Sequence, residues 1–172
     1  MPKILVIGHA RHGKDSVCRI LQQKYNLSFM SSSQFVAEKA VRPWMEKLGI
    51  VYPDFETMYA DRVNHRSTWF DAIAAYNEND PARLGKELFA EYDIYCGLRN
   101  KKEFEALYKD KAFDVSFWVD ASCRVPDEDT SSMTLNYWDA DYIINNNGPE
   151  MQLEQEVIIT MERAANDGLI SL

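Results

Sequence analysis

Short apolar runs alternate with longer amphipathic segments along most of the chain. Apolar runs at residues 3–7, 27–30, 94–97, 115–119 and 142–144 predict five short strands. Between them, apolar residues recur every three or four positions, which predicts helices. Because strands of this kind alternate with helices, we expect an α/β protein with a parallel sheet that is covered on both faces.

Capping residues mark the ends of several predicted helices. Asn26 is typical of a helix terminus, and the serines at 31–33 are typical of the start of the next helix, which we expect to be interrupted near Pro43. Further helices are predicted over residues 53–76, from residue 80 to 89, over 101–111 and over 153–165. Residues 121–135 form a polar stretch of about fifteen residues, longer than most connections and therefore indicative of a functional loop.

The connection between the first strand and the first helix carries the clearest chemical signal. Two glycines with four residues between them, followed by a lysine, let backbone N–H groups turn inward around a phosphate at the positive end of a helix, where Lys14 reaches the β- and γ-phosphates. A glycine-rich turn that binds nothing would leave Lys14 without a role. The sequence therefore predicts a nucleoside triphosphate site made of Gly8, His9, Ala10, Arg11, His12, Gly13, Lys14, Asp15 and Ser16.

Asp15 occupies the position where this loop usually has Ser or Thr. A carboxylate suits Mg²⁺, directly or through a bound water, and the neighbouring Ser16 is placed to donate to the α-phosphate. We therefore expect Asp15 to serve the metal. For His9 and His12 two interpretations stay open: contact with phosphate, or side chains that point to solvent while the backbone binds.

Arginines gather outside the loop. Arg62 and Arg66 are four residues apart and are expected to share one helix face, where they either meet an acceptor phosphate or pair with neighbouring carboxylates. Arg99 follows a strand at the edge where ligands bind, and an unpaired charge is costly there unless a ligand needs it. Arg83, near a helix start, is a weaker candidate for the same role.

Composition limits the class of protein. With 172 residues, 46% of them hydrophobic, and no linker-like segment, the chain is expected to form one domain over residues 1–172. We expect a soluble, cytoplasmic protein with no membrane partner, because no apolar run approaches a membrane span and the three cysteines are widely spaced. The net charge of −8 disfavours binding to nucleic acid.

The loop, Gly97-Leu-Arg99 and the segment Ala-Asp-Tyr-Ile-Ile-Asn-Asn-Asn-Gly at residues 140–148 together resemble phage deoxynucleoside monophosphate kinases. The chain is more distantly similar to adenylate kinases and dephospho-coenzyme A kinase. The resemblance implies a three-layer P-loop kinase fold, with a five-stranded parallel sheet and helices on both faces. It also implies a helical acceptor-binding insertion over residues 31–92 and a short, lid-like loop over residues 121–135.

The resemblance further implies that the γ-phosphate of ATP is transferred, with Mg²⁺, to a deoxynucleoside monophosphate in the host cytoplasm. On this interpretation Lys14, Arg11, Arg99 and Arg124 are catalytic, and the acceptor is bound by Ser32, Arg62, Arg66, Arg83 and Arg99. Arg124 is the one basic residue of the predicted lid, where related kinases carry two or more arginines. We expect Arg11 to supply part of that charge.

Two other functions remain open. An enzyme of similar build would phosphorylate a hydroxymethylated pyrimidine, such as 5-hydroxymethyluracil, in phage DNA, so DNA is a partner only on that alternative. A nucleotide-binding NTPase switch would bind ATP without a phosphoryl acceptor. The base and sugar of the acceptor and the oligomeric state are also open, with a homodimer among the options.

Overall fold

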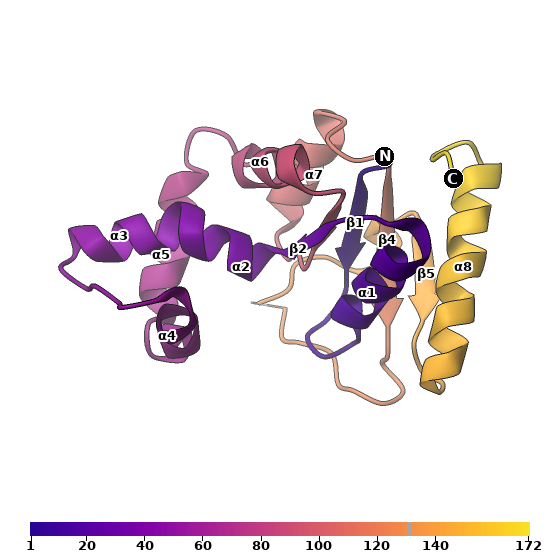
Figure 1. Cartoon of the computed structure of the whole chain (residues 1–172), viewed down its shortest axis with the longest axis horizontal. Coiled ribbons are helices and arrows are strands. Elements are labelled where there is room, and N and C mark those ends of the chain that lie inside the picture. The colour runs from indigo at the N-terminus through magenta and orange to yellow at the C-terminus, as the bar shows by residue number, and fades with distance from the viewer. Residues whose placement is uncertain (131) are drawn as a thin grey trace.

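A computed structural model describes residues 1–130 and 132–172 and shows one five-stranded sheet (Figure 1). All four strand pairings are parallel, and the strand order is β2-β3-β1-β4-β5. The strands are β1 (Ile4–Ile7), β2 (Phe29–Ser31), β3 (Ile94–Cys96), β4 (Val115–Asp120) and β5 (Tyr142–Asn145). The predicted parallel sheet is therefore confirmed, and each predicted strand lies within two residues of its expected bounds.

Helices connect the strands. They are α1 (Lys14–Tyr25), α2 (Ser32–Val36), the π-helical turn η1 (Ala37–Val41), α3 (Arg42–Lys47), α4 (Phe55–Ala60), the 3₁₀ turn η2 (Asp61–Asn64), α5 (Arg66–Tyr76), α6 (Arg83–Glu91), α7 (Lys101–Lys109), the 3₁₀ turn η3 (Tyr137–Asp139) and α8 (Glu150–Asn166). As expected, Asn26 ends α1 in a left-handed conformation and the Ser31 side chain caps α2. None of the helices in the described ranges is long and apolar enough to cross a bilayer.

Alternate residues of β1 supply two separate cores, because side chains of a strand point to opposite faces of a sheet. Ile4 and Val6 pack into a cluster with apolar residues of α1 and α8. Leu5 and Ile7 pack on the other face, in a cluster that includes residues of α2, α6 and α7. Helices on both faces make the three layers that the sequence predicts.

The helices between β2 and β3 confirm one prediction and contradict another. The expected interruption near Pro43 is the π-helical turn η1, where the Arg42 N–H donates to the Ala37 carbonyl just before Pro43, a residue with no N–H to donate. The prediction of one long helix over residues 53–76 is wrong. This segment is split at His65, whose backbone is non-helical (φ −128°, ψ 33°), so Arg62 and Arg66 lie on two elements and share no helix face.

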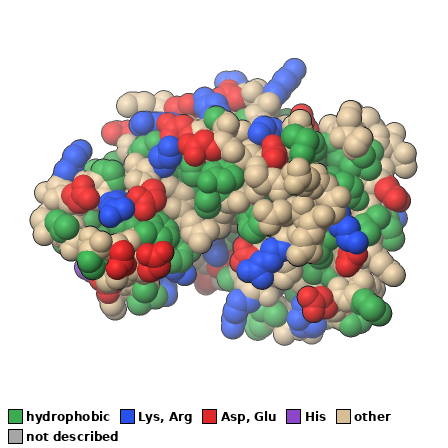
Figure 2. Space-filling view, viewed as in Figure 1, with side chains coloured by type: hydrophobic (Ala, Val, Ile, Leu, Met, Phe, Trp, Pro, Cys, Tyr) green, Lys and Arg blue, Asp and Glu red, His purple; other side chains and the backbone are tan. Residues whose placement is uncertain are grey.

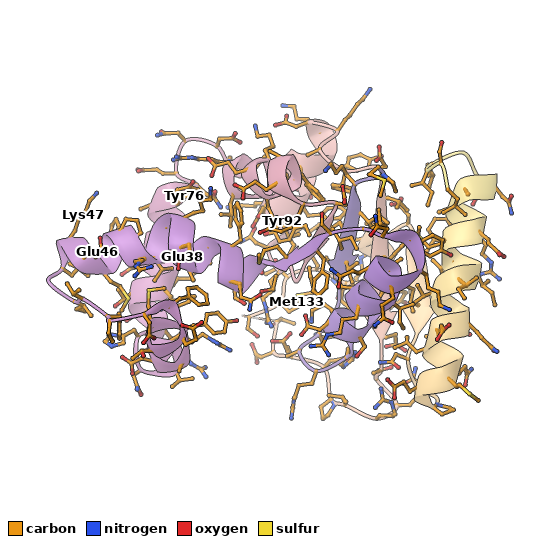
Figure 3. All side chains as sticks on the ribbon, in the orientation of Figure 1. Glu38, Glu46, Lys47, Tyr76, Tyr92 and Met133 are labelled. Carbon is orange, nitrogen blue, oxygen red and sulfur yellow. The ribbon has the colours of Figure 1, made fainter. Side chains whose placement is uncertain are left out.

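Helices α2 to α5, called the insertion below, extend away from the β2 edge of the sheet (Figure 1). Glu38, Glu46 and Lys47, labelled in Figure 3, lie on this part of the molecule, distant from α8. The described helices between β2 and β3 fall within residues 31–92, the range expected for an acceptor-binding insertion.

A first prediction concerns Gly8, where β1 runs into the loop. Its φ is +145°, and a Cβ there would lie 2.6 Å from the Val119 carbonyl oxygen. We expect Gly8→Ala to lower the free energy of unfolding by about 2–4 kcal/mol, because backbone strain and a backbone clash add. Gly49→Ala is the matched control, since Gly49 has φ +80° but no atom within 4 Å of its Cβ position. Equal losses in urea denaturation of the two variants would contradict the clash.

A second prediction concerns Glu103 on α7, which accepts a hydrogen bond from the buried Tyr95 hydroxyl at 2.8 Å. Burial raises the pKa of Glu103 from 4.5 to about 7. The folded state therefore binds more protons than the unfolded state between these values, and stability is lost as the pH rises through this range and stays level above it.

We expect Glu103→Gln to remove that loss and to unfold with about 2 kcal/mol more free energy than the natural chain at pH 8, with little difference at pH 4.5. Glu105→Gln, on the exposed side of the same helix, is the control. The measurement is urea denaturation across pH 4.5–8. A wild-type stability that stays level or rises over this range would contradict the prediction.

Candidate active site

The loop between β1 and α1 has the backbone conformation of an anion cradle. Gly8 and Gly13 adopt positive φ values of +145° and +98°, and Arg11 is left-handed at +63°. The Lys14 ammonium folds back over the loop, where it donates to the carbonyls of Gly8 at 2.8 Å and His9 at 2.7 Å. Burial lowers the pKa of Lys14. A partly desolvated cation thus lies directly over the loop.

The N-terminus of α1 is open toward the loop. Among the described residues no side chain caps it, so the N–H groups of its first turn are free to bind an anion. Asp15 and Ser16 are both exposed in this turn, and the Cys96 thiol donates to an Asp15 carboxylate oxygen at 3.6 Å. This places Asp15 beside the carboxyl end of β3.

Ser32, Gly97 and Lys14 meet at the carboxyl edge of the sheet. The Ser32 hydroxyl donates to the Gly97 carbonyl at 3.2 Å. Gly97 has φ +95°, and a Cβ there would lie 3.9 Å from Lys14 Cε and 3.4 Å from Ser32 Oγ. Figure 2 shows a notch in the lower outline of the molecule, between the insertion and the rest of the chain. The loop, the start of α2 and the residue after β3 therefore bring together two predicted site residues, Lys14 and Ser32, with Gly97.

Residues 121–135 fold onto the loop and are called the lid below; residue 131 lies outside the described residues. His12, which is fully buried, accepts a hydrogen bond from the Ala121 N–H at Nδ1 (3.0 Å). Its proton is therefore on Nε2, which donates to the Val125 carbonyl at 3.1 Å. His9 Nδ1 likewise accepts from the Glu128 N–H at 3.1 Å. Both histidines fasten the lid, a role that neither sequence interpretation included.

The turn after β5 supports the loop from the other side. The Asn146 amide donates to the His12 carbonyl at 2.9 Å, and a Cβ on Gly13 would lie only 2.2 Å from that amide nitrogen. Arg124 donates to the Asn146 carbonyl through Nε (2.9 Å) and Nη2 (2.6 Å). Arg124, which the sequence analysis predicts to be catalytic, is thus linked to the loop through Asn146.

Glu128 of the lid brings a carboxylate into the loop. Its Oε2 accepts from the Ala10 N–H at 2.7 Å, and its Oε1 pairs with the Arg99 guanidinium. Burial works against the charge of Glu128, but the hydrogen bonds from Arg99 and Ala10 outweigh it and lower its pKa. Arg99 is therefore linked to the loop through Glu128, a residue that the sequence analysis did not single out.

The predicted acceptor-binding arginines have different surroundings. The Arg62 guanidinium lies over the Tyr59 ring (3.9 Å to its centre), and the Tyr59 hydroxyl bonds to the Ser33 hydroxyl at 2.7 Å. Arg66 is exposed at the start of α5.

Arg83 differs from these two arginines in its partners. Its guanidinium lies over the Tyr76 ring and pairs with Glu87. None of its contacts within the described residues reaches the loop.

Asp93 precedes β3 and Asp120 ends β4, and both carboxylates have hydrogen-bond partners in the structure. Asp93 accepts from the Ser28 N–H and hydroxyl and pairs with Lys3 at 3.3 Å, which ties β2 and β3 together. Asp120 accepts from the Asn147 amide at 2.9 Å. Groups of three or more His, Cys, Asp or Glu side chains that are suited to a metal are absent from the described residues.

Two residues at the loop were missed by sequence reasoning, Glu128 and Asn146. The signal for Glu128 is the acidic run Asp127-Glu128-Asp129 in a segment expected to cover a phosphate site. Asn146 lies in the Asn-Asn-Asn-Gly segment that contributes to the resemblance, but its hydrogen bond to His12 has no sequence signature.

The whole chain matches solved structures of the P-loop kinase fold. It superimposes on shikimate kinase from Aquifex aeolicus with a TM-score of 0.53 and 15% identity, covering 95% of this chain and 98% of that one. Shikimate kinase from Bacteroides thetaiotaomicron gives 0.51 and 12%, with coverages of 95% and 98%. TT1252 from Thermus thermophilus gives 0.51 and 15%, with coverages of 94% and 97%.

No protein-family model and no curated protein sequence matches this chain. At these identities the structural likeness establishes the fold alone. The chain has the fold of the small P-loop kinases.

A third prediction tests the lid anchor. His12→Ala removes a buried ring and leaves the Ala121 N–H and the Val125 carbonyl without their partner, so we expect a loss of about 2–4 kcal/mol in unfolding free energy. We also expect faster amide hydrogen exchange at Ala121. His65→Ala, a partly exposed histidine of the insertion, is the control. Unchanged exchange at Ala121 in folded His12→Ala protein would contradict the anchoring role.

Proposed function

We propose that this protein is an ATP- and Mg²⁺-dependent phosphotransferase that passes the γ-phosphoryl group to a small molecule, and that its acceptor is a deoxynucleoside monophosphate. The observation that carries the proposal is the arrangement at the carboxyl edge of the sheet. The loop with Lys14 over it lies beside Ser32 and Gly97, where the insertion joins the sheet, and is linked to Arg99 through Glu128. The two substrates would meet at this junction.

The reaction needs charge neutralisation more than covalent chemistry. An oxygen of the acceptor attacks the γ-phosphorus, the bond from this phosphorus to the β–γ bridging oxygen breaks, and ADP leaves with the electron pair. Lys14 and the N–H groups of the loop would hold the β- and γ-phosphates. Arg11, Arg99 and Arg124 would neutralise the charge that develops on the transferred group.

The donor set at the start of α1 fits magnesium. Asp15 and Ser16 present exposed hard oxygen atoms next to Lys14. A magnesium ion in such a site keeps several of its waters and is bound mainly through the phosphates of the nucleotide. A preformed cage of three protein ligands is therefore not required. The chemistry supplied by an ion held there is neutralisation of phosphate charge.

The acceptor would be held between β2, β3 and the insertion. Ser32 lies at the loop, and Arg62 is placed by its contact with Tyr59, which is bonded to Ser33 of α2. Arg62 and the exposed Arg66 would then offer positive charge to an acceptor phosphate. Arg83 would assist only if α6 presents it differently in a complex, because its guanidinium is engaged with Tyr76 and Glu87.

A second acceptor class is favoured by the likeness to two shikimate kinases. A small hydroxylated carboxylic acid such as shikimate would use the same arginines for its carboxylate. A hydroxymethylated pyrimidine in DNA remains an acceptor to test, although the net charge of −8 counts against it.

The fourth prediction is the test of this function. The purified protein is incubated with Mg²⁺, γ-labelled ATP and, in parallel, the deoxynucleoside monophosphates, shikimate and DNA containing 5-hydroxymethyluracil. We expect label in a deoxynucleoside diphosphate. Lys14→Ala is expected to lower kcat/KM about 10²–10³-fold, the cost of losing a charge at the transferred group.

Lys24→Ala is the matched control for Lys14→Ala, because Lys24 is on the same helix and pairs with Glu154 at the surface. It should retain the wild-type rate. Label in shikimate or in DNA would replace the proposed acceptor, and release of free phosphate alone would indicate an NTPase. Full activity of Lys14→Ala would overturn the proposed function itself.

A further inference from the structure

A carboxylate of the lid lies at the loop, in the place where an anion is expected to bind. The Glu128 carboxylate accepts from the Ala10 N–H at 2.7 Å with one oxygen and pairs with Arg99 through the other. Ala10 belongs to the loop that curls around phosphate, and Arg99 follows β3 at the acceptor side. The carboxylate therefore bridges the two groups between which a γ-phosphoryl group would lie.

A carboxylate can imitate part of a phosphate because both present charged oxygen acceptors to N–H donors. The Glu128 side chain is only 17% exposed, so this charge is partly removed from water. It is compensated by Arg99 and by the Ala10 N–H. A bound phosphate would satisfy the same two donors.

We propose that Glu128 is an internal competitor of the nucleotide, which holds the place of the γ-phosphoryl group in the free protein and is displaced when ATP binds. The inference rests on the proposed function, since it assumes that the loop binds ATP. Arg99 then exchanges one partner for another: it pairs with Glu128 before binding and with the phosphoryl group afterwards. The exchange makes Arg99 available only when its substrate has arrived.

The contacts of the lid allow a local displacement. His12 holds the lid near its start, at Ala121 and Val125, and these hydrogen bonds do not involve Glu128. At the far end the buried Met133, labelled in Figure 3, and Leu135 pack into the core cluster. Glu128 lies between these anchors, and its own backbone N–H donates to His9 Nδ1 at 3.1 Å. Rotation of the Glu128 side chain can therefore take the carboxylate out of the loop while this backbone contact and both ends of the lid stay in place.

The fifth prediction follows from this competition. Removing the charge of Glu128 should raise the affinity for ATP, because the nucleotide no longer has to displace the contacts of this carboxylate. We expect Glu128→Gln to bind ATP about tenfold more tightly than the natural protein, and Glu128→Ala to change in the same direction. ADP lacks the γ-phosphate, so its affinity should rise less. The measurement is isothermal titration calorimetry with ATP and with ADP, and thermal unfolding confirms that both variants are folded.

Asp127→Asn is the matched control. It removes the same charge from the neighbouring residue, which lies 3.6 Å from His9 and 3.8 Å from His12 and pairs with neither Ala10 nor Arg99. Its ATP affinity should change much less than that of Glu128→Gln. An equal gain in both variants would show a general effect of lid charge and overturn the inference.

The remaining outcomes separate this inference from the proposed function. If the natural protein binds ATP, Lys14→Ala does not, and Glu128→Gln binds no more tightly than wild type, the competitor role is wrong and the proposed function survives. Loss of phosphoryl transfer in Glu128→Gln at unchanged ATP affinity would likewise overturn the competitor role, because Glu128 would then act in the reaction. If neither the natural protein nor Glu128→Gln binds ATP, the proposed function fails together with the inference.

Discussion

The candidate site depends on two positions where the backbone leaves no room for a side chain. Gly8 passes so close to the Val119 carbonyl that a Cβ would lie 2.6 Å from its oxygen, and a Cβ on Gly13 would lie 2.2 Å from the Asn146 amide nitrogen. These two close contacts fix the loop between β4 and the turn after β5. The loop is thus held by the sheet before any ligand arrives, which is how a preorganised anion site avoids reorganisation on binding.

The free loop satisfies its charges with parts of the same chain. Lys14 donates to two loop carbonyls, and Glu128 accepts from a loop N–H and pairs with Arg99. Because buried polar groups are costly without partners, such substitutes stabilise a site whose ligand is absent. On the proposed function, these contacts would be exchanged when a phosphate enters, so the stability of the free protein and its affinity for nucleotide would oppose each other.

The insertion and the sheet are joined at the point where an acceptor would sit. The Ser32 hydroxyl donates to the Gly97 carbonyl across this junction. Within the insertion, the hydroxyls of Ser33 and Tyr59 form a hydrogen bond, and Arg62 is placed over the Tyr59 ring. Movement of the insertion would therefore carry Arg62 with it. A phosphotransferase benefits from such coupling, because closing around both substrates excludes water from the transferred group.

Local patterns in the sequence determined the strands and the caps at Asn26 and Ser31, because each depends on residues close together in the chain. The alternation of strands with helices along the chain predicted the parallel sheet. The break at His65 escaped prediction, since apolar spacing continues through it and only the backbone there shows the change. Glu128 and Ala10 are 118 residues apart, and His12 and Val125 are 113 apart. Contacts at such separations arise only when the sheet brings its loops to one edge, so the lid's place in the loop was decided by the tertiary structure.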